Sequence, residues 1–130
     1  MTEGQADLVY YRLKRAKETL EEAQVMFDSG HFYGAANRIY YACFYAVVAL
    51  LLTKNLSSGK HSGAMGLFNM HFVKSGDIPK DMGKFYSRIF DNRLESDYGE
   101  LMEAEPDEIR QDLATAREFI DLIAKMIAQR

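Results

Sequence analysis

The sequence predicts an all-α protein, an antiparallel up-and-down bundle of about five helices. Apolar residues recur every three or four positions along most of the chain, and no segment alternates with the two-residue period of a strand. Only two prolines occur among the 130 residues, Pro79 and Pro106, so long uninterrupted helices are allowed. No linker or internal repeat divides the chain, and we expect residues 1–130 to form a single helical domain.

The first expected helix covers about 22 residues and ends at Ser29-Gly30. Its apolar stripe steps by four and three residues through Val9, Leu13, Ala16, Leu20, Ala23 and Phe27. The second expected helix runs from His31 to about Lys54, and from Tyr40 to Leu52 it is apolar on every side. We therefore expect it to be the central helix. Small residues that would let a neighbouring backbone approach lie near one side, at Ala35, Ala42, Ala46 and Ala49.

The apolar run Tyr40–Leu52 predicts a buried core helix rather than a membrane span. It covers 13 residues, contains three tyrosines, and falls short of the about 20 residues that a span needs. The N-terminal segment carries no apolar signal core. The one cysteine, Cys43, lies inside the run and is expected to be a small buried side chain. Together these features predict a cytoplasmic protein without a membrane partner.

Three further helices are expected after a Ser- and Gly-rich loop. The third covers His61 to about Lys74, and the fourth opens at Pro79 and weakens toward Gly99. The last begins at Pro106, with acidic residues in its first turn that suit the helix dipole. Its apolar stripe contains Ile109, Leu113, Ala116, Ile120, Ile123 and Ile127.

Charge and motifs exclude several classes of function. The net charge is −3, from 16 basic and 19 acidic residues, which argues against coating nucleic acid by bulk electrostatics but leaves room for a small basic cleft. The chain has no P-loop, no HExxH and no di-iron carboxylate motif. Its three histidines, His31, His61 and His71, are widely scattered. We therefore expect no metal and no cofactor.

Two polar clusters remain as candidates for chemistry. In the first, Asn37 and Arg38 stand at the head of the most apolar helix. They either lie exposed on its first turns, or Arg38 pairs with a carboxylate from elsewhere in the fold. In the second, Arg93 and Asp97 are four residues apart with Tyr98 beside them. This is either a surface ion pair contributing about 0.3–0.5 kcal/mol, or a cluster in which the guanidinium binds phosphate.

These clusters, and the segment between them, carry a family resemblance. The stretches Ala35–Tyr45, Lys60–Pro79 and Phe90–Gly99 resemble HEPN domains of the small stand-alone prokaryotic subgroup, over roughly Leu8 to Ile127. The resemblance implies an up-and-down bundle that forms homodimers with a shared polar cleft. It also implies a minimal nucleotidyltransferase as partner, in a module of the toxin–antitoxin type.

The resemblance further implies a ribonuclease motif, of which this chain keeps one half. Active members of the family are metal-independent ribonucleases with an arginine followed a few residues later by a histidine. Arg93 matches the arginine, but no histidine follows it, and Asp97-Tyr98 stands there instead. Aspartate is a weak base at neutral pH, and His61 is the histidine that could come in from another helix or from the partner subunit. In some members a nearby tyrosine accepts AMP from the partner, and Tyr98 is the nearest equivalent.

Three functions stay open on the sequence. The chain is the HEPN component of a two-protein module that binds nucleotide or RNA, with Asn37, Arg38, His61 and Tyr98 as binding residues. Alternatively, it is a metal-independent ribonuclease whose motif differs from that of the family, with Arg93 and Asp97 as its catalytic residues. In the third interpretation, it is a non-catalytic structural or regulatory dimer.

Overall fold

A computed structural model of the chain describes residues 1–98 and 105–129, and for residues 94–98 it describes the helical backbone. The described part holds five α-helices and one π-helical segment, and no strand. The prediction of an all-α bundle is therefore confirmed. The elements are α1 (Glu3–Asp28), α2 (Phe32–Leu52), α3 (His61–Phe68), η1 (Asn69–Val73), α4 (Lys80–Tyr98) and α5 (Pro106–Ala128).

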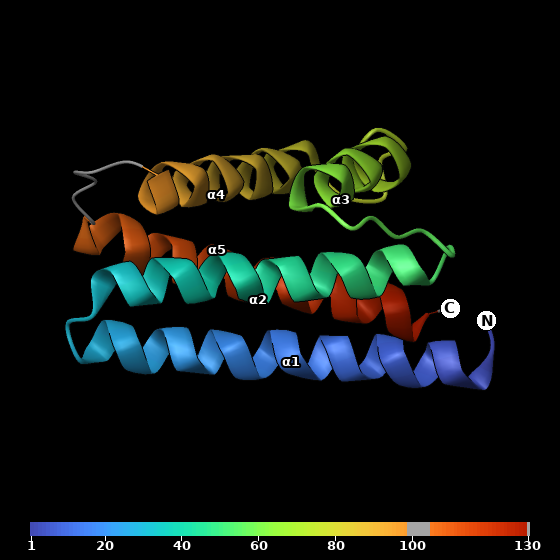
Figure 1. Cartoon of the computed structure of the whole chain (residues 1–130), viewed down its shortest axis with the longest axis horizontal. Helices are drawn as coiled ribbons and strands as arrows, with labels where there is room; N and C mark the ends of the chain where they lie inside the picture. Colours follow the sequence, from blue (N-terminus) through green and yellow to red (C-terminus); the bar gives the residue numbers. More distant parts are fainter. Residues whose placement is uncertain (99–104, 130) are drawn as a thin grey trace.

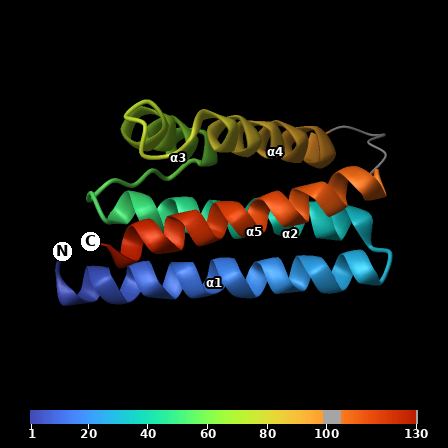
Figure 2. The ribbon, with the colours of Figure 1, turned by 180° about the vertical axis from the view of Figure 1, so that it is seen from behind.

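The helices form three layers, as Figures 1 and 2 show from opposite sides. Helix α1 makes one outer layer, α2 and α5 lie together in the middle, and α3 and α4 make the other outer layer. Helix α2 contacts α1, α3, α4 and α5, which makes it the central element that its sequence predicts. Helix α1 begins and α5 ends at the same end of the bundle (Figure 1).

Local sequence signals explain where α1 begins and ends. Thr2 accepts a hydrogen bond from the Gln5 backbone amide at 3.1 Å, and the Gln5 side chain accepts one from the Thr2 amide at 2.9 Å. This capping box starts α1 at Glu3, one and a half turns before its first buried apolar residue, Val9. The helix ends before Ser29-Gly30, as predicted, because Gly30 adopts a φ of +80°, which glycine tolerates without strain.

Helix α2 combines great length with deep burial. It covers 21 residues with a mean hydropathy of 1.5, so by length and composition it could cross a membrane. However, 56% of its most apolar stretch is buried among the other helices, as in the core helix of a bundle. Ala42, Cys43 and Ala46 are fully buried. Burial also raises the pKa of the Cys43 thiol far above its usual range, so this side chain stays neutral as expected.

The third expected helix is only partly α-helical. It is regular through Phe68 and then widens into the π-helical turn η1, where the Lys74 amide donates to the Asn69 carbonyl at 2.8 Å. Helix α4 follows and approaches η1 closely at Gly83. A Cβ at that position would lie 2.9 Å from Val73 Cγ1, so the absent side chain permits this contact.

An aromatic core joins the outer layer of α3 and α4 to the middle layer. The rings of Phe68, Tyr86 and Phe119 lie with centroids 5.4 to 5.8 Å apart, one each from α3, α4 and α5. Tyr86 also stacks on Tyr40 of α2 at 6.2 Å. Tyr40 also connects this core to polar residues of α3 and α4, His61 and Arg93.

Candidate functional site

The first polar cluster lies in the early turns of α2, on a surface shared with α1. Arg38 donates to the Asn37 side-chain oxygen, with its Nη2 at 3.0 Å and its Nε at 3.3 Å, and both residues are half-buried. The Arg38 Nη1 lies 3.8 Å from Glu22 Oε1 of α1, and its guanidinium carbon lies 5.4 Å from the Tyr41 ring centroid. Of the two alternatives for Arg38, pairing with a carboxylate from elsewhere in the fold agrees better with the structure. The ion pair between Arg38 and Glu22 is nevertheless long and partly exposed to solvent.

His61 enters the same region from the start of α3. Its Nδ1 lies 2.8 Å from the hydroxyl of Tyr40, a side chain that is only 1% exposed. The imidazole also stacks on Phe44, with centroids 4.1 Å apart and an interplanar angle of 5°. One hydrogen bond and one stacked ring therefore hold the orientation of His61 from two directions.

The protonation of Tyr40 suits this hydrogen bond. Burial raises the pKa of Tyr40 to about 12, so its hydroxyl keeps the proton at neutral pH. A neutral phenol can donate to Nδ1 of a neutral imidazole, or accept from Nδ1 of an imidazolium. The contact can therefore persist while His61 gains or loses a proton, which a group that transfers protons requires.

Arg93 reaches the same two tyrosines from α4. Its Nη2 lies 3.4 Å from the Tyr41 hydroxyl, and its guanidinium carbon lies 5.3 Å from the Tyr40 ring centroid and 5.7 Å from that of Tyr41. The Tyr41 ring meets His61 edge-on at 5.7 Å. Tyr40 and Tyr41 thus bring together residues from three helices that are far apart in sequence.

The structure therefore brings four of the candidates, Asn37, Arg38, His61 and Arg93, together around Tyr40 and Tyr41. We call this cluster the tyrosine site. Asp97 and Tyr98 belong to the last turn of α4, but their side chains lie outside the described residues. The other two histidines are elsewhere. His31 is exposed at the start of α2, and His71 is half-buried in η1, as expected for a residue between two apolar neighbours.

Sequence reasoning missed the residues that join these candidates. Tyr40, Tyr41 and Phe44 look like ordinary core residues of an apolar run, yet they make the contacts that hold His61 and Arg93. One signal was available: a tyrosine in a buried run needs a partner for its hydroxyl, which phenylalanine would not. That signal shows a partner is needed without naming it.

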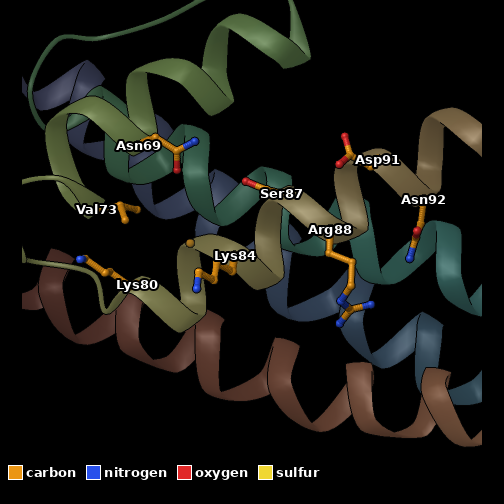
Figure 3. A pocket seen from close by; sticks show the side chains of 9 residues that line it. Asn69, Val73, Lys80, Lys84, Ser87, Arg88, Asp91 and Asn92 are labelled. Carbon is orange, nitrogen blue, oxygen red and sulfur yellow. The ribbon is translucent and has the colours of Figure 1, made fainter.

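A larger groove lies between η1 and α4, and Figure 3 shows its side chains. It is wide and open, and its basic side chains are Lys80, Lys84 and Arg88. Arg88 turns toward α5 (Figure 3), where its Nη2 pairs with Asp112 at 2.7 Å and its Nη1 lies 3.4 Å from Glu108. The lining holds no aromatic ring, so this groove offers no surface on which a nucleotide base could stack, whereas the tyrosine site does.

The tyrosine site has the groups needed to hold a phosphate and to move a proton. The guanidinium carbons of Arg38 and Arg93 both lie within 6 Å of the Tyr41 ring centroid. Each guanidinium can donate two parallel hydrogen bonds to the oxygens of a phosphate. His61 supplies an imidazole, a group that can both accept and donate a proton. Among the described residues, no three His, Cys, Asp or Glu side chains gather as a metal site.

Comparison with known proteins identifies the family. The family model for the HEPN domain matches residues 9–127. A "UPF0332 protein" of Thermotoga maritima is 45% identical over 127 residues, which are 98% of this chain and 96% of that protein. "Putative toxin MJ0605" of Methanocaldococcus jannaschii is 33% identical over 88% of this chain and 84% of its own length. A second protein of that organism, "Putative toxin MJ0142", is 28% identical over 91% of this chain and 80% of its own length. This chain belongs to the HEPN domain family.

Proposed function

We propose that this chain is the HEPN component of a two-protein module of the toxin–antitoxin type, and that its tyrosine site binds nucleotide or RNA. The observation that carries the proposal is the meeting of Arg38, His61 and Arg93 around Tyr41. The toxin names of two relatives support a module of this type. The partner is a minimal nucleotidyltransferase, the active form is a homodimer, and the module works in the cytoplasm.

The physical argument rests on concentrated positive charge in an acidic protein. The whole chain carries a net charge of −3, yet two arginines converge on one half-buried tyrosine. A phosphate between them gains charge-assisted hydrogen bonds, and the tyrosine ring offers a stacking surface for a base. This combination favours a ligand that carries both a phosphate and an aromatic base.

The first test measures binding of fluorescently labelled AMP and a short oligoadenylate to the purified chain. Arg93→Ala is expected to weaken binding about 10-fold or more, because it removes a charged hydrogen-bond donor. Arg93→Lys should restore only part of the affinity, since lysine keeps the charge without the planar fork. Arg117→Ala, an exposed arginine on α5, is the matched control and should bind like wild type. Equal binding by wild type and Arg93→Ala would rule out this site.

The second test concerns the partner. The genes beside that of this chain are searched for a minimal nucleotidyltransferase, the two proteins are co-expressed, and a complex should elute together on size exclusion. Intact mass after incubation of the pair with ATP should show an added AMP, which peptide mapping is expected to place on Tyr98. The absence of such a gene and of any co-purifying partner would contradict the two-protein module.

A second candidate function, metal-independent RNA cleavage, is favoured by the hydrogen bond that fixes His61. In this reaction His61 takes the proton of a ribose 2′-hydroxyl, the 2′-oxygen bonds to phosphorus, and the bond to the 5′-oxygen breaks as that oxygen takes a proton from water. Arg93 stabilises the charge that develops on the phosphoryl oxygens. His61 thereby fills the role of the histidine that is missing after Arg93.

Cleavage of labelled RNA in the presence of EDTA tests this candidate. His61→Ala and Arg93→Ala should each abolish cleavage, whereas His31→Ala, which removes an exposed histidine at the start of α2, should leave it intact. Cleavage that survives both site substitutions in folded protein would assign the activity to another site or to a contaminant.

A further inference from the structure

A second groove adjoins the tyrosine site, between α1, α2 and the loop that follows α2. Its volume is about 350 Å³, and its lining includes Tyr11, Arg12 and Arg15 of α1 and Phe44 and Tyr45 of α2. Loop residues Ser57 and Ser58 close one side. No single sequence pattern predicts this surface, because its residues belong to two separate helices, α1 and α2, and to the loop after α2.

Two aromatic contacts make this groove continuous with the tyrosine site. Phe44 lines the groove and stacks on His61 at 4.1 Å. Tyr45 also lines it, and its ring centroid lies 6.3 Å from that of Tyr41, which borders Arg93. A strand of nucleic acid that leaves Tyr41 along α2 therefore reaches the groove next.

Arginines accompany the aromatic rings along this whole surface. The guanidinium carbon of Arg15 lies 5.7 Å from the Tyr45 ring centroid, repeating the arrangement of Arg38 over Tyr41 at 5.4 Å. Arg12 Nη1 donates to the Val48 carbonyl at 3.4 Å, which holds its guanidinium at the groove. Aromatic rings that stack on bases, with arginines that follow the backbone, are the pattern of surfaces that bind single-stranded nucleic acid.

We infer that this groove is a further subsite of the RNA path, which holds nucleotides of the same strand beyond those bound at the tyrosine site. The inference rests on the proposed function, because it extends the RNA path of the tyrosine site. The axial distance along α2 from Arg38 to Val48 is about 15 Å, the length of about four stacked nucleotides, so an octanucleotide at the tyrosine site reaches the groove and a dinucleotide does not. Tyr45 and Tyr11 provide stacking surfaces for the base, and Arg12 and Arg15 contact the backbone phosphates.

Charge favours RNA over a second copy of the chain as the occupant. A two-fold interface sets a surface against itself, so a dimer built on this groove would bring the arginines of two copies together. The nearest acid that the described contacts give to Arg15 is Glu18, which is exposed and 3.7 Å away, so it neutralises little of that charge. A polyanion compensates the arginines directly.

The test compares two labelled oligoadenylates, a dinucleotide that fills the tyrosine site and an octanucleotide that also spans the groove. Tyr45→Ala should weaken octanucleotide binding about 5- to 150-fold, the effect of losing one stacked base, and leave dinucleotide binding unchanged. The double variant Arg12→Ala/Arg15→Ala should lower the slope of log affinity against log salt by about 1.4, since two phosphate contacts are lost.

Matched variants separate stacking and local charge from general effects. Tyr45→Phe keeps the ring and should bind the octanucleotide like wild type. Lys17→Ala/Arg117→Ala removes two positive charges from the different groove between α1 and α5, and should leave the salt slope unchanged. Because Tyr45 is half-buried, Tyr11→Ala provides a second variant, whose 60% exposed side chain can be removed without disturbing the core.

The outcomes distinguish failure of the groove subsite from failure of the proposed function. If Arg93→Ala loses binding while Tyr45→Ala, Tyr11→Ala and the double arginine variant bind the octanucleotide like wild type, the subsite is refuted and the proposed function stands. If wild type binds neither oligonucleotide, both are refuted. If the double arginine variant changes from dimer to monomer with unchanged RNA affinity, the groove is a contact between copies, and the subsite is likewise refuted.

Discussion

Tyr40 belongs to the core and to the candidate site at once. Its ring packs against Tyr86 and Phe90, each with a centroid 6.2 Å away, and only 1% of the residue is exposed. Its hydroxyl meets His61 at 2.8 Å. Packed rings in a core have little freedom to move, so the position of the Tyr40 hydroxyl is fixed. The His61 imidazole is hydrogen-bonded to this hydroxyl and is therefore held in place as well.

Replacing Tyr40 with phenylalanine tests this joint role. Tyr40→Phe keeps the ring and removes the hydrogen bond, so the free energy of unfolding should fall by about 1 kcal/mol in urea titrations. Affinity for nucleotide should fall as well, because His61 loses its hydrogen bond to the Tyr40 hydroxyl. Tyr33→Phe, on a residue that is 55% exposed, is the control and should change neither quantity. Unchanged binding by Tyr40→Phe would mean that the Tyr40 hydroxyl is not needed to position His61.

Tyr40→Phe also isolates the contribution of Tyr40 to the loss of stability at alkaline pH. The pKa of Tyr40 rises from 10.0 to about 12 in the folded state because of burial, so between these values the unfolded chain releases a proton that the folded chain keeps. Stability should therefore be full below pH 10 and fall as the pH rises toward 12, by about 1–3 kcal/mol from this residue. Cys43 and Tyr86, whose pKa values burial also raises, add losses of the same sign.

The difference between wild type and Tyr40→Phe, followed by urea unfolding from pH 8 to 11.5, removes those other contributions. The stability advantage of wild type should shrink above pH 10. An advantage that stays constant across this range would show that the Tyr40 hydroxyl ionises equally in both states.

At the residue scale, the sequence named the polar residues that meet around Tyr41 but not what they touch. Asn37 and Arg38 were candidates because they stand at the head of an apolar run, and Arg93 and His61 because of the family's arginine–histidine motif. Their meeting point at Tyr41 could not be predicted. It depends on how the loop after α2 returns His61 to that helix and on the rotation of α4, neither of which residue spacing encodes.

Among the helices, α2 shows how small residues set the packing distance. Ala35, Ala42, Ala46 and Ala49 are fully buried, and α2 contacts every other α-helix. Short side chains let the neighbouring backbones come close, and the interior that results has no room for added volume. The sequence predicted this close approach from the alanine positions alone.

A larger side chain at one of these positions should therefore be costly. Ala46→Leu is expected to lower the free energy of unfolding by about 1–3 kcal/mol in urea titrations, because the extra carbons must displace packed neighbours. Ala36→Leu, at an exposed position of the same helix, makes the identical chemical change and should cost far less. Equal effects of the two substitutions would show that helix propensity, rather than packing, decides the result.

Element boundaries followed from the sequence wherever a chemical signal marked them. Ser29-Gly30 ended α1 and Pro106 began α5 as predicted. The start of α1 was missed because the apolar stripe begins at Val9, while the capping box at Thr2 and Gln5 starts the helix earlier. The π-helical turn Asn69–Val73 was also missed, since its widened hydrogen bonds leave the apolar pattern almost unchanged.

On the scale of the whole molecule, the proposed ligand surface crosses all three layers. The tyrosine site joins α2 of the middle layer to α3 and α4 of one outer layer through His61 and Arg93. The adjoining groove joins α2 to α1 of the other outer layer. A ligand that lies along this surface contacts groups that come together only when the layers are assembled, so it should bind the folded chain and not the unfolded one.

Binding should therefore stabilise the fold by mass action. At an octanucleotide concentration about 100 times the dissociation constant, the folded state gains about 2.7 kcal/mol, which appears as a rise in the temperature of thermal unfolding. Arg93→Ala, at the same oligonucleotide concentration, should show little of this rise, whereas Arg117→Ala should show all of it. The rise should also shrink with added salt, because the contacts are to phosphates. An octanucleotide that binds wild type without raising its unfolding temperature would contradict a site assembled from three layers, because such a ligand would bind the unfolded chain equally well.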